Sequence, residues 1–465
     1  MTSSTYRARR AHRAQRILTA TVAAFAAAAA LTFSIGARGA ASADEAQQLK
    51  STLTPLGAER AGSKDGVIPA WTGAEVKGGD LQGGRRSDPF ASEKPLYTIT
   101  AQNMAQYVDK LTDGQQALLK KYPDYRIDVY STHRTGIGPQ WVYDATFKNA
   151  TNAKLEAGNL KVTGAYGGIP FPIPKSGDEA IWNHLLRWAP AGEVEDYNHY
   201  AITADGSRVL LASGKLYEQR PYYVKGGADK FDGYYWKGYQ VNLAPALRAG
   251  EATVGWAAID RADSVDPAWT YLPGQRRVRK LPVAAYDTPV PATSGFSTFD
   301  ELNVFLGAPD RYEWKIIGKK ELIVPYNVNR ALQYKDDQVL GKHFINPDAV
   351  RWEVHRVWVV DAQLKPGKRH QIPHKRFYLD EDTWTAVLAD GWDANGQLWK
   401  SYWQWLVTMS DAPGALATSF GSYDLTTGAY LAETLLGSSR AQYVIPAQGL
   451  SNDMFTAEAM AAAGQ

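Results

Sequence analysis

A pair of histidines is the first candidate for chemistry in this chain. His370 and His374 have a four-residue spacing that allows two imidazoles to hold one metal ion. Pro373 interrupts the helix that this arrangement needs, and cationic side chains crowd the pair. These are Lys368, Arg369, Lys375 and Arg376. We therefore expect a solvated loop here and no metal site.

Asp380, Glu381 and Asp382 are the second candidate, because neighbouring carboxylates serve acid–base hydrolysis. They lie between two strand patterns, where we expect an exposed hairpin turn. The sequence contains no nucleophile elbow, phosphate-binding loop, dinucleotide glycine fingerprint or zinc-protease motif. We therefore predict no catalytic residue and no cofactor.

Three arginines, Arg276, Arg277 and Arg279, interrupt an otherwise apolar strand pattern. Successive residues of a strand point to opposite faces, so the three cannot share one side. One interpretation is an edge strand that charge protects from aggregation. The other is that Arg277 or Arg279 lies at a cavity rim and binds an anionic head group, since guanidinium pairs bidentately with phosphate and carboxylate.

Aromatic residues are abundant, with 15 Trp and 26 Tyr in 465 residues. Several alternate along predicted strands, and period two places each set on one face. Examples are Tyr312, Trp314 and Ile316, and Trp384, Ala386 and Leu388. Such faces are either ordinary core or the lining of a cavity for an acyl chain, a terpenoid or a sugar. The predicted ligand-binding residues are Tyr271, Arg277, Arg279, Trp314, Trp358, Trp384 and Trp403.

The N-terminal residues predict export. Arginines precede an apolar run over residues 17–35, and the small residues Ala-Ser-Ala follow at 41–43. This is the order of a secretory signal peptide, here residues 1–43, that is cleaved before Asp44. The alternative is an uncleaved anchor, because the apolar run approaches the length of a membrane span. We expect Sec export and a periplasmic location.

Composition narrows the function further. The chain has 51 basic and 48 acidic residues, but six of the arginines and none of the acids lie in residues 1–43, so the remainder is slightly acidic. We therefore expect no nucleic-acid partner. The absence of cysteine excludes disulfides, thiolate chemistry and N-terminal lipidation.

The chain divides by composition. Residues 44–96 are rich in glycine, proline and charge, which predicts an extended N-terminal arm. We assign a single domain to residues 97–455 and a tail to residues 456–465. Alternation dominates much of the domain, and residues 205–206, 380–382, 393–396 and 427–428 are typical of hairpin turns. We predict that the second half is antiparallel β.

Capping signals predict helices in the first half of this domain. We expect two short helices between Thr100 and Pro123, and another after Ser176. The stiff apolar run at residues 167–174 leads into the last of these helices. It either gates a pocket mouth or crosses the end of a barrel.

Several segments resemble known families. Residues 269–282, Trp-Thr-Tyr-Leu-Pro-Gly-Gln-Arg-Arg-Val-Arg-Lys-Leu-Pro, resemble the strand signature of outer-membrane lipoprotein-sorting proteins, and the resemblance continues to about residue 405. The whole chain after the signal is similar to the domain of unknown function 1329 (DUF1329) family. The segments that carry this similarity are 53–57, 68–73, 88–90, 167–172 and 182–188.

These resemblances imply an α+β fold of the LolA/LolB type. It is an open antiparallel β half-barrel with helices packed on its concave side around a hydrophobic cavity, here with a long N-terminal arm. They also imply work alongside an inner-membrane exporter of the resistance-nodulation-division type, with an outer-membrane protein as a further partner.

We therefore expect a periplasmic, non-catalytic carrier or chaperone for a lipid or lipid-like molecule. An exported hydrolase of glycans or hydrophobic esters is one alternative. A structural adaptor between exporter and outer membrane is the other.

Overall fold

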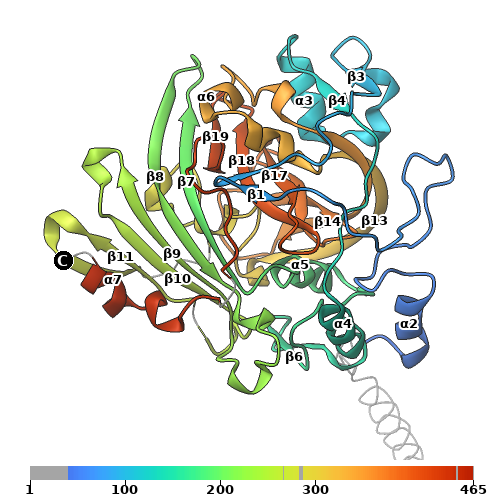
Figure 1. The fold of residues 1–465 in the computed structure, drawn as a ribbon, viewed down its shortest axis with the longest axis horizontal. Helices are drawn as coiled ribbons and strands as arrows, with labels where there is room; N and C mark the ends of the chain where they lie inside the picture. Colours follow the sequence, from blue (N-terminus) through green and yellow to red (C-terminus); the bar gives the residue numbers. More distant parts are fainter. Residues whose placement is uncertain (1–39, 265, 282–285, 447–448, 464–465) are drawn as a thin grey trace, which may run out of the picture. The chain divides into compact units, whose positions relative to one another are not determined.

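Most of the described strands join one sheet. The computed structural model describes residues 40–264, 266–281, 286–446 and 449–463 (Figure 1). In spatial order, the main sheet contains β12 (Arg277–Leu281), β11 (Ala268–Leu272), β10 (Ala252–Ala258), β9 (Tyr234–Ala244), β8 (Arg208–Gln219), β7 (Gly192–Ile202), β19 (Tyr430–Leu435), β18 (Ala415–Asp424), β17 (Leu398–Thr408), β16 (Ala386–Trp392), β15 (His374–Asp380), β14 (Trp352–Leu364), β4 (Ile127–Val129) and β3 (Tyr97–Ile99).

A further long strand, β13 (Tyr312–Pro325), also pairs with β14. The described pairings are antiparallel except for one parallel bridge between β4 and β14. Among the described residues, no pairing joins β12 to the other end of the sheet, so the sheet is open. The predicted α+β class with an open antiparallel sheet is confirmed. Two small hairpins lie outside the sheet, β1 (Leu81–Gln82) with β2 (Arg85–Arg86), and β5 (Lys154–Glu156) with β6 (Lys161–Thr163).

Two predicted helices form where their capping signals lie. Thr112 accepts a hydrogen bond from the Gln115 amide at 3.2 Å and starts α3 (Asp113–Lys121). Ser176 accepts one from the Glu179 amide at 3.2 Å and starts α5 (Gly177–Leu185). The remaining helices are α2 (Ala43–Gln47), α4 (Gln140–Asn152), α6 (Asp336–Val339) and α7 (Ala457–Ala463).

The prediction of another helix between Thr100 and Leu111 is wrong. Its residues form two separate 3-10 turns, Met104–Gln106 and Val108–Lys110. Tyr107 between them has a φ of −127°, which breaks the helical hydrogen-bond pattern.

The predicted hairpin turns at residues 205–206, 393–396 and 427–428 connect neighbouring antiparallel strands. Gly206, Gly396 and Gly428 each have a φ between +75° and +88°, which glycine adopts without strain.

One predicted strand face is wrong. Ala386 pairs with Leu379 and Leu388 pairs with Tyr378, so Val387 is an extra residue in β16. This bulge moves Leu388 to the face opposite Ala386, and Trp384 precedes the strand. The alternation of Tyr312, Trp314 and Ile316 along β13 is confirmed, because all three pack in one cluster.

The sheet carries a core on each face. On the inner face, α5 packs against β13 and β14 and contributes Ile181, Trp182 and Leu185. On the outer face, α3 packs against β16 and β17 through Leu118 and Leu119. Helices therefore pack on both faces of the sheet.

The N-terminal arm lies against the sheet through buried contacts. Arg86 is fully buried and donates to both carboxylate oxygens of Asp411, at 2.6 and 2.9 Å. The indole of Trp384 donates to the Leu56 carbonyl at 2.8 Å. Residues 1–39 of the predicted signal peptide lie outside the described residues. None of the described helices has the length and apolar character to cross a membrane.

Candidate functional site

A pocket opens on the inner face between the two halves of the sheet. Its floor is formed by β7 to β11 and by β18 and β19, and residues 286–306, which we call the cover segment, lie over it. The cavity measures about 110 Å³. Alternate residues of each strand face inward, for example Thr253, Gly255 and Ala257 of β10.

The cover segment is held in place by two buried carboxylates. Asp300 pairs with Lys375 of β15 at 2.9 Å and Glu301 pairs with Lys400 of β17 at 2.6 Å. Burial opposes ionisation of Asp300, but Lys375 and His370 hold its pKa well below the usual value. The cover segment is therefore anchored to the sheet by charge as well as by apolar packing.

Apolar side chains form much of the cavity wall. They come from the sheet and from the cover segment and include Leu216, Trp236, Phe420, Val290, Phe299 and Leu306. Buried pockets for small hydrophobic molecules have this composition, with a few polar groups that orient the ligand.

One end of the cavity is charged. Arg220 donates to Glu193 at 2.6 Å and to Glu218 at 2.9 Å. Burial raises the pKa of Glu193 to about 8, and Glu218 adds to the rise while Arg220 opposes it. For Glu218, burial is outweighed by Arg220, which holds the pKa below its usual value. Of the two partners of Arg220, Glu218 therefore ionises more readily and Glu193 less readily.

The middle of the cavity is polar but uncharged. Burial raises the pKa of Glu433 to about 8, and burial with the nearby Glu193 raises that of Glu195 well above its usual value. Burial lowers the pKa of His199 to about 3, so this imidazole is neutral. Its Nδ1 accepts a hydrogen bond from the Thr434 amide at 3.0 Å.

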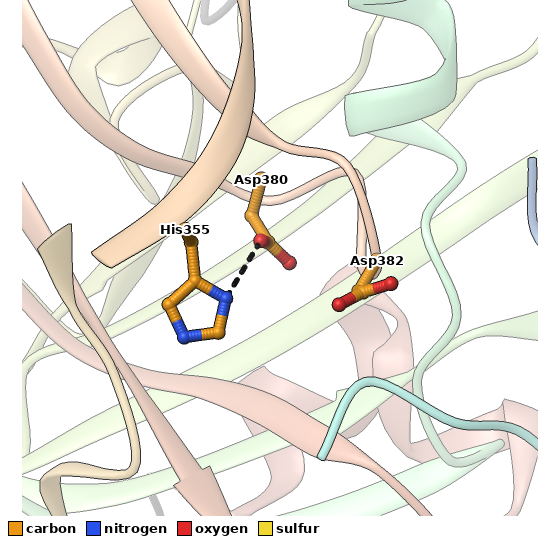
Figure 2. Close-up of side chains that lie close together, drawn as sticks. All are labelled: His355, Asp380 and Asp382. Carbon is orange, nitrogen blue, oxygen red and sulfur yellow. Dashed lines mark ion pairs between the residues drawn. The ribbon is translucent and has the colours of Figure 1, made fainter. Parts of the chain in front are cut away.

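A second cluster of polar side chains, His355, Asp380 and Asp382, is buried and does not border this cavity. His355 Nδ1 is 3.7 Å from Asp380 Oδ1, and Asp382 lies beside them (Figure 2). One potential ligand atom of each residue falls within 4.8 Å of the others, so the three are the candidate metal ligands of the described chain. Burial and Asp382 raise the pKa of Asp380 to about 7.

The contacts of Asp382 favour a structural role for this group. Arg134 donates to its two oxygens at 2.9 and 2.7 Å and also to the arm carbonyl of Glu59 at 2.8 Å. A guanidinium that occupies both oxygens competes directly with a metal ion.

The exposed hairpin expected at Asp380, Glu381 and Asp382 is half right. The segment does join β15 to β16, but Asp380 is fully buried and the other two are 2% exposed. The arm covers the turn, because Glu59 pairs with Arg356, which also pairs with Glu381. A contact between residues 297 positions apart leaves no local pattern in the sequence.

The two predicted histidines do not converge. His370 Nε2 lies 2.8 Å from Asp300 and His374 Nε2 lies 2.9 Å from Asp361. The expected solvated loop is wrong for His370, whose side chain is 1% exposed, because Asp300 of the cover segment holds it.

The predicted ligand-binding residues are spread over four places. Trp314, Trp358 and Trp384 share the inner core under α5, where the rings of Trp358 and Trp384 stack with centroids 6.0 Å apart. Trp403 lies on the outer face with α3, and Tyr271 packs with Met460 of α7.

Arg277 and Arg279 are exposed on β12, which ends the sheet. None of the seven predicted residues borders the inner cavity. A role for any of them in ligand binding stays a prediction.

The apolar run at residues 167–174 is fastened to helices. Phe171 exchanges two hydrogen bonds with the Asn183 side chain of α5, at 2.9 and 2.7 Å. Gly168 packs tightly on Thr146 of α4. These contacts favour the connecting segment over the gate.

The polar residues of the cavity were missed in the sequence. Glu193, Glu195 and His199 occupy alternate positions of β7 and face the cavity, yet Asp196 and Asn198 make the other positions polar too. The one signal in the sequence is that β7 is polar on both faces, which is unusual for a long strand and indicates that one face borders a polar cavity.

The comparisons with known proteins agree on one family. Residues 98–461 match the family model described as "Protein of unknown function (DUF1329)". The uncharacterized protein PA3922 of Pseudomonas aeruginosa is 39% identical over 409 residues, which cover 87% of this chain and 90% of that protein.

Solved structures with a similar arrangement are more distant. A DUF1329 family protein from Desulfovibrio piger has a TM-score of 0.40 at 14% identity and covers 58% of this chain and 92% of its own. A putative outer membrane lipoprotein-sorting protein domain from Vibrio parahaemolyticus has a TM-score of 0.38 at 13% identity, with the same coverage. The LolA superfamily protein NE2245 from Nitrosomonas europaea has 0.35 at 8%, covering 62% and 100%.

These TM-scores are low, and the open antiparallel sheet is established by the strand pairings of this chain alone. The family match extends over most of the chain and confirms the predicted family. The chain therefore belongs to the DUF1329 family of proteins of unknown function.

Proposed function

We propose that this protein is a periplasmic, non-catalytic carrier that holds a hydrophobic molecule in its inner-face cavity. The observation that supports it is the cavity itself, with apolar walls from two halves of the sheet and an anchored cover segment. A preformed pocket of this kind binds the apolar body of a ligand, and its few polar groups fix the orientation.

Filling the cavity tests the proposal. Gly255 borders the cavity, and a Cβ atom added there would meet only ordinary contacts at 3.7 Å or more. Gly255→Leu should therefore keep the fold and occupy the space of the ligand. We expect loss of binding of a fluorescent acyl ester, measured by titration.

Gly274→Leu is the matched control, because Gly274 is exposed and an added Cβ atom meets nothing within 4 Å. It should bind the probe as the wild type does. Equal binding by the wild type and both variants would show that the probe does not bind in the cavity. Absence of binding by the wild type would contradict the carrier function.

The proposed partners follow from the family resemblance. We propose delivery to or from an inner-membrane exporter of the resistance-nodulation-division type and an outer-membrane protein, after Sec export and removal of residues 1–43. Sequencing of the mature N-terminus and affinity purification from cross-linked cells test these two statements. A mature chain that retains its first residues, or purification without envelope proteins, would contradict them.

A further inference from the structure

Three side chains on the cavity wall have polar atoms without a hydrogen-bond partner in the described part of the chain. They are Glu433 Oε2, Thr418 Oγ1 and Thr434 Oγ1. All three residues border the cavity, and each is at least 94% buried. Because native proteins pair most of their buried polar atoms, three unpaired atoms on one cavity wall indicate the place of a polar ligand group.

The backbone is distorted where two of these side chains lie. The pairing of β19 with β7 shifts between Ala432 and Leu435, and Thr434 has a φ of +50°. A β-branched residue rarely adopts this conformation. Successive strand residues normally face opposite sides, but here Glu433 and Thr434 both border the cavity. The Thr434 backbone is held there by His199 and by the Ser419 hydroxyl, which donates to its carbonyl at 2.8 Å.

Burial favours the protonated, uncharged form of Glu433 at neutral pH. Burial raises its pKa to about 8, Ser297 lowers it and Glu301 raises it. Lys400 lowers it too, but its ammonium pairs with Glu301 at 2.6 Å. The imidazole of His199 is neutral. The Glu433 carboxyl therefore offers an O–H donor, as do the two threonine hydroxyls.

The remaining charges disfavour an anion in this cavity. Arg220 is already paired with Glu193 and Glu218. The carboxyl groups of Glu195 and Glu433 have no such cation among their contacts in the described residues. A carboxylate or phosphate placed among them would raise the local negative charge without a free guanidinium to offset it.

We propose that Glu433, Thr418 and Thr434 bind the uncharged, hydrogen-bond-accepting end of an amphiphile, such as an ester carbonyl or a hydroxyl, and that the cavity excludes anionic lipids. This inference rests on the proposed carrier function and names its ligand class. It differs from the anionic head group expected at Arg277 or Arg279, which lie on β12 away from the cavity. The Arg279 guanidinium instead donates to Gln275 at 2.6 Å.

Three ligands with the same alkyl chain test the class. Methyl palmitate, palmitate and hexadecyltrimethylammonium should be compared at pH 7 by displacement of a fluorescent acyl ester. We expect the methyl ester to bind at least about tenfold more tightly than the carboxylate, because a buried carboxylate loses its hydration and finds no free cation among the described residues to compensate. Tightest binding by the ammonium, or equal binding by palmitate, would overturn the ligand class while the carrier function stands. Binding by none of the three would instead remove the proposed function.

The titration of Glu433 gives a second test. Glu433→Gln keeps an N–H donor and cannot ionise. In the wild type, affinity for methyl palmitate should fall about tenfold for each pH unit above the carboxyl pKa, because ionisation removes the donor. Glu433→Gln should bind at pH 7 as the wild type does and show no such fall. Glu313→Gln, an exposed control on β13, should keep the wild-type pH profile. An unchanged profile in Glu433→Gln would contradict the inference.

Discussion

At the level of single residues, the buried ion pair of Arg134 and Asp382 has a structural role. Both side chains are at most 3% exposed, and the pair joins the turn after β15 to the N-terminal arm. Removing one partner of a buried ion pair leaves the other charge uncompensated, which costs far more than losing a surface pair.

Asp382→Asn should therefore lower the free energy of unfolding by about 3 kcal/mol, the lower end of the range for a broken buried pair. We expect the lower end because Glu381 remains 3.5 Å from the guanidinium. Urea unfolding measures the loss. Asp263→Asn is the control, since Asp263 is 82% exposed and 3.9 Å from Lys161. A similar small loss in both variants would show that Arg134 does not need the charge.

Few of the residues at the candidate site could be predicted from the sequence. The aromatic alternation correctly placed Tyr312, Trp314 and Ile316 on one face of their strand. It could not place Trp384, because this residue has a φ of +61° in a turn that the arm covers. Glu433 and Thr434 border the cavity because the pairing of β19 with β7 is distorted. His199 of β7, which holds the Thr434 amide, lies 235 residues earlier in the chain. Such long-range effects leave no local pattern.

At the scale of elements, local signals predicted local structure. The caps at Thr112 and Ser176 and the glycine turns encode their own geometry within four residues. The helix α4 gave no such signal, because it begins after Pro139 without a side-chain cap and buries Thr146 and Asn149 among its inward residues. These polar groups are satisfied by tertiary bonds, including Asn149 to the Gly168 carbonyl at 3.0 Å.

The edge strand β12 separates the two interpretations of its arginines. Arg277 and Arg279 are exposed at the end of the sheet, where charge prevents pairing with other chains. We expect the double variant Arg277→Thr, Arg279→Thr to self-associate, as measured by size exclusion with light scattering, and to bind the acyl ester normally. A monomeric variant with weakened ligand binding would support the cavity-rim interpretation instead.

At the scale of the whole molecule, buried acids should set the dependence of stability on pH. Burial raises the pKa of Glu433 and Glu193 to about 8, and that of Asp390 to about 7. Between the unfolded pKa of about 4.5 and these values the folded chain binds more protons, so stability falls as the pH rises. Glu218 and Glu353 have lowered pKa values, so they stabilise the folded chain in their ionised form. This stabilisation is lost as the pH falls below about 4.5 and they become protonated.

The melting temperature should therefore be highest near about pH 5 and decline toward about pH 8. Calorimetry across this range measures it, and Glu433→Gln should show a smaller decline because it removes one of the buried acids. A melting temperature that rises steadily from pH 5 to pH 8 would mean that these carboxyls are not buried as described.

If the inner cavity carries a hydrophobic molecule, that molecule should accompany the protein through purification. Organic extracts of the wild type, Gly255→Leu and Gly274→Leu should be compared by quantitative mass spectrometry. We expect a neutral amphiphile that accompanies the wild type and Gly274→Leu in a fixed molar ratio and is absent from Gly255→Leu. Equal amounts in all three proteins, or no amphiphile in any of them, would contradict this expectation.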